Sequence, residues 1–232
     1  MSLDFDNQGF VVTGPSGPLG SMLSEMATRR GAHLMFCLPP GAAWSSEGAP
    51  RLSHMTAELS REEEADRLFD MAVDRLPEIR VLISVLDVPR EDASRALHET
   101  SPADWNRACT APLRSAFLVS QRAVQEFLAA GKGGRIIFVI QGARPRAGQT
   151  IHFTLQYALG ALCRSITKEY GRREITANVL LVPDAGTAEA GPIAETVLFL
   201  ASPEASFVNG QVLQAGDGQA QVLAGGRQYV ER

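Results

Sequence analysis

The sequence has little of what marks several large classes of protein. Its net charge is −4, so no excess of positive charge favours binding to nucleic acid or to an anionic membrane surface. Its apolar runs are no longer than a β-strand, which argues against a membrane-spanning helix. The first residues are acidic and lack the pattern of a signal peptide, so we expect a cytoplasmic protein.

Cysteine is also scarce. Cys37, Cys109 and Cys163 lie far apart, and no Cys-x-x-Cys pair or cysteine–histidine spacing suggests a metal site. Three cysteines do not form a complete disulfide framework. We therefore expect three reduced thiols and no bound metal.

What the chain does have is a regular alternation of strand-like and helix-like segments. Apolar runs predict strands at residues 9–13, 34–38, 54–59, 79–86, 135–140, 176–182 and 211–214, and patterned segments predict helices at 21–30, 60–76, 102–130, 152–170 and 193–201. Strands that are apolar nearly throughout are typical of a parallel sheet covered on both faces. We expect a Rossmann-like, doubly wound parallel α/β sheet of about seven strands with helices on both faces.

Local signals mark the ends of some of these helices. Ser60 and Glu63 form a capping-box pattern, which predicts that the second helix begins at Ser60. Gly31 ends the first helix, because glycine adopts the positive φ of a helix C-terminus. No repeat or linker divides residues 1–232, so we expect a single domain.

Several segments together resemble the short-chain dehydrogenase/reductase family. In chain order they are Thr13-Gly14, Trp105-Asn106-Arg107, Gly134-Arg135-Ile136-Ile137, Ile175-Thr176-Ala177-Asn178 and Asn209-Gly210-Gln211. Each motif is weak by itself, but their order and spacing extend over almost the whole chain. The resemblance implies the fold of the family, and a fold does not establish an activity.

The resemblance implies a phosphate-binding turn with three glycines, where the backbone approaches NAD or NADP. Thr13, Gly14 and Gly20 match that pattern, and Gly17 lies one position early. Pro18 stands where the middle glycine belongs. Proline has no N–H and carries a ring where the backbone should be bare. We expect no cofactor, or NAD or NADP only if Gly17 gives the turn a shifted path.

Other nucleotide contacts depart from the family as well. The family's second strand ends with an acid for the ribose, or has an arginine nearby for a 2′-phosphate, whereas this strand ends in Leu38. Val85 and Leu86 replace small residues and should crowd the cofactor. Glu58 matches an acid near the adenine in the family, although a surface glutamate is the simpler interpretation.

The catalytic positions are changed too. In the family a tyrosine is the acid/base, a lysine four residues later lowers its pKa, a serine orients the substrate and an asparagine anchors a relay water. By the register of the flanking helix, His152 replaces the tyrosine and Gln156 the lysine. The serine position falls at Ile140 or Gln141, and the asparagine position at Pro112. We interpret these as vestigial positions and expect no catalytic residue.

The segment that covers the substrate in the family is missing from the pattern. Family members insert it after the sixth strand, but here the next predicted helix follows residues 183–192 at once. Such a segment excludes water and grips the substrate. Its loss would remove the part that gives substrate specificity.

Three hypotheses follow. In the first, the chain is a catalytically degenerate member that acts as a structural or regulatory subunit of a dehydrogenase or ketoreductase. In the second, it is an oxidoreductase that uses His152 as acid/base. In the third, it is a binding module that holds a small molecule in the vacated cleft.

The first hypothesis requires a partner, either an active paralogue or a second copy of this chain. The resemblance places the contacts on the helices at 105–130 and 152–170 and on the C-terminal tail at 223–230, in a dimer or tetramer. The candidate contact residues are Phe117, Val124, Leu155, Leu159 and Leu162.

Overall fold

The protein is built on one sheet of seven parallel strands, in the order β3-β2-β1-β4-β5-β6-β7. The computed structural model describes residues 3–14, 17–42, 51–87, 96–142, 150–183 and 186–216. The strands are β1 (Gln8–Thr13), β2 (His33–Leu38), β3 (Leu52–Thr56), β4 (Glu78–Asp87), β5 (Gly134–Gln141), β6 (Ile175–Leu181) and β7 (Val212–Gln214). The predicted doubly wound parallel sheet is confirmed.

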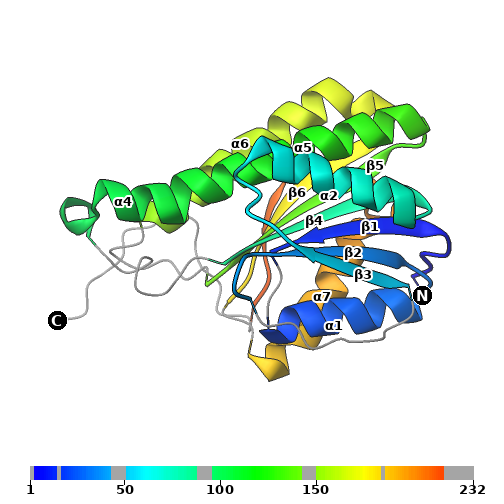
Figure 1. The fold of residues 1–232 in the computed structure, drawn as a ribbon, viewed down its shortest axis with the longest axis horizontal. Coiled ribbons are helices and arrows are strands. Elements are labelled where there is room, and N and C mark those ends of the chain that lie inside the picture. Colours follow the sequence, from blue (N-terminus) through cyan, green and yellow to red (C-terminus); the bar gives the residue numbers. More distant parts are fainter. Residues whose placement is uncertain are drawn as a thin grey trace.

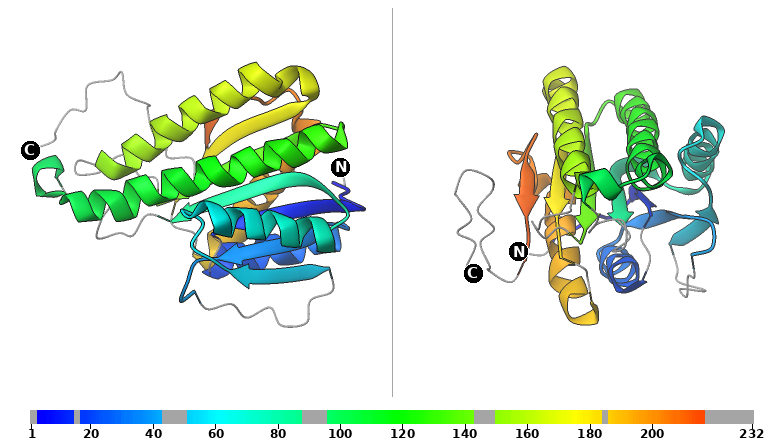
Figure 2. Two further views of the ribbon diagram at one scale, coloured as in Figure 1. Left: turned by 45° about the horizontal axis from the view of Figure 1, so that its top comes forward. Right: turned by 90° about the vertical axis from the view of Figure 1, so that its left-hand side faces the viewer.

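Helices cover both faces of this sheet (Figures 1 and 2). They are α1 (Gly17–Arg29), α2 (Glu62–Arg75), α4 (Pro102–Trp105), α5 (Ala111–Ala130), α6 (Thr150–Tyr170) and α7 (Thr187–Ala201). The helices α2, α5 and α6 pack on one face, and α1 and α7 on the other. The short helix α4 lies well beyond the carboxyl ends of the strands.

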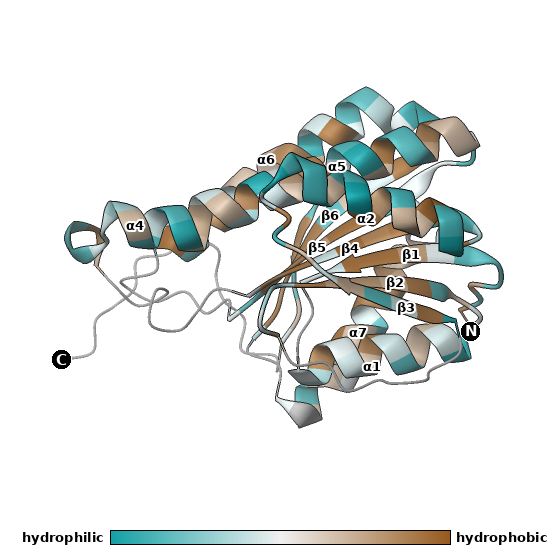
Figure 3. Ribbon diagram, viewed as in Figure 1, coloured by the Kyte–Doolittle hydropathy of each residue, from teal (hydrophilic) through white to brown (hydrophobic). Residues whose placement is uncertain are grey.

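Two hydrophobic cores explain why the strands are apolar nearly throughout. Successive side chains of a strand point to opposite faces, so Val11 joins the core under α2, α5 and α6, and Val12 joins the core over α1 and α7. Figure 3 shows the apolar strands between helices whose outer faces are hydrophilic. Within the described part of the chain, no helix is both long enough and apolar enough to cross a bilayer.

Four helices begin at residues other than those predicted. Helix α1 begins at Gly17 instead of 21 and α6 at Thr150 instead of 152, and the starts of α2 and α7 differ as well. Arg61 is the N-cap of α2, and the hydroxyl of Ser60 donates to Glu58 at 2.8 Å, so the capping-box prediction was wrong. Helix α7 begins at Thr187, six residues before the predicted start at 193, and it contains Pro192. The local signal at Ser60 is misleading because the neighbouring carboxylate of Glu58 takes its hydroxyl. The start of α7 is set by the short connection from β6.

The helix predicted at 102–130 contains a π-helical segment, Asn106–Thr110. The N–H of Ala111 bonds to the carbonyl of Asn106, five residues back. Pro112 follows directly and has no N–H to donate to a carbonyl four residues back. A wider turn in front of a proline lets the helix continue into α5 without an α-helical bond at that position.

Candidate active site

The phosphate turn joins β1 to α1 at the carboxyl end of the sheet. Residues 15 and 16 lie outside the described residues, and α1 begins at Gly17, whose φ is 64° and beside whose Cα there is open space where a side chain would lie. Pro18 is the second residue of α1 and is exposed. Proline is common in the first turn of an ordinary helix, where an N–H has no helical partner. The first turn therefore offers one backbone donor fewer to a phosphate.

Thr13 and Gly14 have structural partners beside β4. The buried Thr13 hydroxyl donates to the Ser84 hydroxyl at 3.1 Å. Gly14 has a φ of 76°, and a Cβ there would lie 2.1 Å from the carbonyl oxygen of Val85. Gly20 is buried within α1. The requirements on Thr13 and Gly14 are thus met by packing between β1 and β4, without reference to a nucleotide.

The ends of β1 and β2 offer no lysine or arginine to the ribose and phosphate groups of a dinucleotide. Leu38 ends β2 and is buried. Residues 1–28 and 31–50 contain no lysine or arginine, so no cation from the phosphate turn or the β2 loop faces a 2′-phosphate. The side chains present do not fit NAD or NADP in the way that the family resemblance implies.

The end of β4 differs from the expectation of a crowded cleft. Val85 and Leu86 are both buried, Val85 in the core over α1 and α7 and Leu86 in the core under α5 and α6. They pack away into the two cores because successive strand residues face opposite sides. The backbone of Asp87 pairs with Gln141 of β5.

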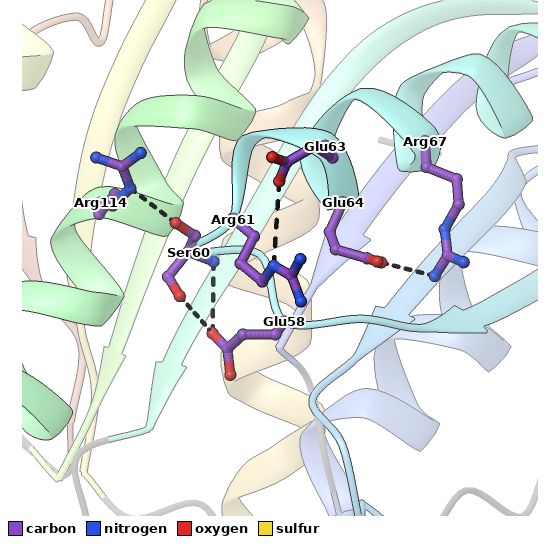
Figure 4. A network of polar contacts seen from close by, with 7 residues as sticks. All are labelled: Glu58, Ser60, Arg61, Glu63, Glu64, Arg67 and Arg114. Atoms are coloured by element: carbon purple, nitrogen blue, oxygen red, sulfur yellow. Dashed lines mark hydrogen bonds and ion pairs between the residues drawn. The ribbon is translucent and has the colours of Figure 1, made fainter.

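Glu58 is an exposed residue whose carboxylate has a local role. Its Oε1 accepts from the Ser60 hydroxyl at 2.8 Å and from the Ser60 N–H at 3.4 Å (Figure 4). The carbonyl of Ser60 accepts from Arg114 Nε at 2.7 Å, which links this loop to α5. The interpretation of Glu58 as a surface glutamate agrees with this geometry.

The two positions of the acid/base pair lie one turn apart on α6. His152 is 3% exposed and Gln156 is 6% exposed. Residues four apart share a helix face, so the two side chains point the same way. Tyr157 is 61% exposed, as expected for the next residue around the helix, and does not take the place of the missing tyrosine. A glutamine carries no charge that would lower the pKa of a neighbouring group.

The position of the family's serine carries no hydroxyl, and the position of the family's asparagine carries no side-chain amide. Ile140 lies in the core under α5 and α6, whereas Gln141 is the last residue of β5, so Gln141 is the polar group at the serine position. Pro112 is half-buried in the first turn of α5. Its side chain offers no hydrogen-bond donor or acceptor to a relay water.

The connection after β6 is short. The strand ends at Leu181 and α7 begins at Thr187, which leaves only residues 182–186 between them. Five residues are too few for a helix or hairpin that would cover a bound substrate. The predicted loss of the covering segment therefore agrees with the element bounds.

The three thiols lie outside this chemistry. Cys37, Cys109 and Cys163 are free and buried. Burial raises the pKa of the Cys37 thiol to about 12, and burial likewise raises the pKa of Cys163 to about 12. These groups are neutral at physiological pH and are poor nucleophiles.

Comparison with known proteins agrees with this architecture. The model of the short-chain dehydrogenase family matches residues 8–197. The chain belongs to the short-chain dehydrogenase family. Among solved structures, a short-chain dehydrogenase/reductase from Serratia marcescens superposes with a TM-score of 0.75 at 21% identity, covering 91% of this chain and 97% of its own. At that identity the likeness shows the fold alone.

Curated relatives within the short-chain dehydrogenase family are named as oxidoreductases. The (3R)-3-hydroxyacyl-CoA dehydrogenase of Mus musculus is 27% identical over 90% of this chain and 94% of its own length. The 3-oxoacyl-[acyl-carrier-protein] reductase FabG of Salmonella typhimurium is 24% identical over 95% and 100%. The (2S)-[(R)-hydroxy(phenyl)methyl]succinyl-CoA dehydrogenase subunit BbsD of Thauera aromatica is 27% identical over 73% and 77%.

Proposed function

We propose that this chain is a non-catalytic subunit that pairs with a catalytically intact short-chain dehydrogenase or ketoreductase. The observation that carries the proposal is the burial of His152 and Gln156, neither of which carries a fixed charge, at the positions of the family's tyrosine and lysine. A lysine that serves a cofactor must stay charged and reach it. Gln156 is neutral and is packed into the helix–sheet interface, so it serves stability instead.

Four further features support the same conclusion independently. The first turn of α1 contains a proline, β2 ends without an acid, the loop at 39–50 contains no lysine or arginine, and the connection after β6 has five residues. Each lies on a different element. An active enzyme that changed one group would retain the others, whereas here the cores are retained and the chemistry is not.

The partner would bind the outer face of α5 and α6. Helix α5 exposes Phe117 by 51% and Leu128 by 41%, and both line a groove of about 350 Å³ between the two helices. Tyr157 of α6 is 61% exposed and lies outside the groove lining. Exposed aromatic and aliphatic side chains gathered on one face are typical of a protein interface. Of the predicted contact residues, Phe117, the half-buried Leu162 and the buried Val124 line the groove, whereas Leu155 and Leu159 are fully buried.

An intact family member is the partner that this face and this site together favour. A homodimer would contain no acid/base pair in either copy, so it would leave the retained fold without a reaction. The Thauera aromatica relative is named as one subunit of a dehydrogenase, which indicates that subunit assemblies occur among relatives of this chain. The C-terminal tail at 223–230, the third predicted contact, lies outside the described residues.

The use of His152 as acid/base is the less favoured alternative. A proton donor to a substrate must approach the reacting atom within hydrogen-bond reach. His152 is 3% exposed, and no covering segment follows β6 to hold a substrate against it.

The test is co-expression of this chain with an intact family member encoded in its genomic neighbourhood. We expect a stable hetero-oligomer by size-exclusion chromatography with light scattering. The Tyr157→Asp variant should lose it, because a charge would be buried in an apolar contact. Phe207→Asp is the control, since Phe207 is fully exposed after α7 and does not line the groove between α5 and α6. Assembly that survives Tyr157→Asp would contradict the proposed face.

The second test concerns the isolated chain. We expect no binding of NAD(H) or NADP(H) by isothermal titration calorimetry and no reduction of a 3-oxoacyl substrate. Nucleotide binding in the micromolar range would contradict the non-catalytic assignment. Turnover that disappears in His152→Ala would establish the alternative in its place.

A further inference from the structure

A second polar depression lies at the amino ends of the strands, on the opposite edge of the sheet from the cleft. Its volume is about 290 Å³, and its lining includes Asp6, Glu78, Arg80 and Arg135. Arg80 belongs to β4 and Arg135 to the neighbouring strand β5. Two guanidinium groups on adjacent strands therefore face one small space.

A β-bulge directs Arg80 into this depression. The adjacent residues Gly9 and Phe10 of β1 pair with Ile79 and Val81 of β4, so Arg80 is the extra residue between them. On its other side, β4 pairs Val81 with Arg135. A bulge breaks the alternation of side chains and re-aims the residue that it inserts. Here it brings Arg80 beside Arg135.

The two arginines retain donors that the described protein does not use. Arg135 donates Nη1 to the carbonyls of Gly134 and Glu174 and Nε to the carbonyl of Ser202, and no ion pair with it occurs among the described residues. Arg80 donates Nη1 to Glu78 at 3.2 Å. Nη2 of Arg135, and Nε and Nη2 of Arg80, have no bond within the described part of the chain.

The two carboxylates that line the depression also have contacts outside it. Glu78 is already held by Lys132 at 2.8 Å as well as by Arg80, which lowers its pKa. Asp6 lines the depression too, but a Cβ on Gly31 would overlap its Oδ1, so its carboxylate lies against the Gly31 backbone. Two guanidinium groups and two carboxylates thus line the depression, and each carboxylate has another contact outside it. Burial, followed by the charge of Arg80, lowers the pKa of Arg135, while Glu174 opposes the shift.

We propose that this depression is an oxyanion site, in which Arg80 and Arg135 hold a phosphate or carboxylate group of a small molecule. An oxyanion between two guanidinium groups accepts charge-assisted hydrogen bonds from the unused donors and relieves the repulsion between like charges. The site lies at the amino ends of the strands, on the opposite edge of the sheet from the vacated cleft, so it does not depend on whether the chain is catalytic.

The test titrates the full chain with inorganic phosphate and, separately, with citrate, at constant ionic strength in a non-coordinating buffer. We expect saturable one-to-one binding of at least one of the two by calorimetry, with a higher thermal midpoint. The Arg80→Gln variant should bind at least tenfold more weakly. Arg80 is the residue of choice because Arg135 also bonds three backbone carbonyls, and its removal would endanger the fold.

Arg67→Gln is the matched control, since Arg67 lies on α2 at the other edge of the sheet, where it pairs with Glu64. This variant should bind like the parent protein. Tighter binding of phosphate than of citrate would identify a phosphate group as the ligand, and the reverse would identify a carboxylate. The proposal is overturned if neither anion binds, or if Arg80→Gln binds as tightly as the parent.

Discussion

Gln156 illustrates how a single position is tied to its surroundings. It is buried on the same face of α6 as His152, and neither residue carries a fixed charge. Restoring the family's two residue types would therefore bury a cation without a partner. In the family, the tyrosine and lysine work only together with a bound nucleotide, whose ribose and phosphates are held by the protein, and with a segment that covers the substrate.

We predict that the double variant His152→Tyr, Gln156→Lys stays inactive. It should lose about 3–5 kcal/mol of unfolding free energy, because the new ammonium group is buried without a counter-charge. Urea denaturation and an NADPH oxidation assay with a 3-oxoacyl substrate measure both effects. Gln156→Met, similar in size and neutral, is the control and should remain close to the parent in stability. Recovery of turnover in the double variant would refute the prediction.

The buried thiols give a prediction for alkaline pH. The folded-state pKa values of Cys37 and Cys163 are raised to about 12 from an ordinary 9.0, so the folded protein holds these protons more tightly than the unfolded chain. Their contribution is complete below pH 9 and declines between pH 9 and 12. At pH 10 each thiol should cost about 1.4 kcal/mol of unfolding free energy.

Chemical denaturation at pH 8 and pH 10 measures this decline. The Cys37→Ala, Cys163→Ala variant should be less stable at pH 8 because it creates cavities, but its stability should fall less between the two pH values. An equal fall in both proteins would show that other groups cause the alkaline loss.

At the scale of the element, the entrance to β5 depends on a close packing contact. A Cβ on Gly134 would lie 2.2 Å from the ring of Phe127, which is buried near the end of α5. We predict that Gly134→Ala loses about 1–3 kcal/mol of stability by overpacking. In a Phe127→Leu background the same change should cost less, because the ring edge is gone. Equal costs in both backgrounds, measured by urea denaturation, would disprove the steric explanation.

The elements themselves were largely readable from the sequence, because apolar runs such as Leu34 to Leu38 have no other place than a sheet covered on both faces. The exact starts were not. Ser60 has the residue type of a cap, yet its hydroxyl prefers the carboxylate of Glu58, a competition that a local pattern does not reveal. The π-helical segment before Pro112 was also missed, since helical periodicity alone does not register one extra residue in a turn.

For the candidate site, the sequence predicts which side chains stand at each position but not how they are packed. The register of α6 places His152 and Gln156 on one face, but only the structure reveals that both are buried. Leu155 and Leu159 were expected at an interface and lie in the core, because one apolar stripe serves the sheet and a different one faces outward. The sequence does not predict the orientation of Arg80, because a β-bulge leaves no mark in the sequence pattern.

At the scale of the whole molecule, assembly and stability should be linked. A partner that binds only the folded chain raises its apparent stability by mass action. We predict that the thermal midpoint of the co-purified complex exceeds that of the isolated chain and rises with protein concentration. Differential scanning calorimetry at several concentrations tests this. The Tyr157→Asp protein should show a low midpoint that is independent of concentration, and a concentration dependence in that variant would place the contact elsewhere.

The length of the five-residue connection between β6 and α7 limits which changes in sequence could give this chain a covered substrate site. A changed side chain such as Gln156 or Pro18 can be reversed by substitution at one codon. A missing covering segment cannot, because it must be inserted as a folded unit that fits both flanking elements. With only residues 182–186 between β6 and α7, point mutation alone cannot give this chain a substrate site enclosed by a covering segment there.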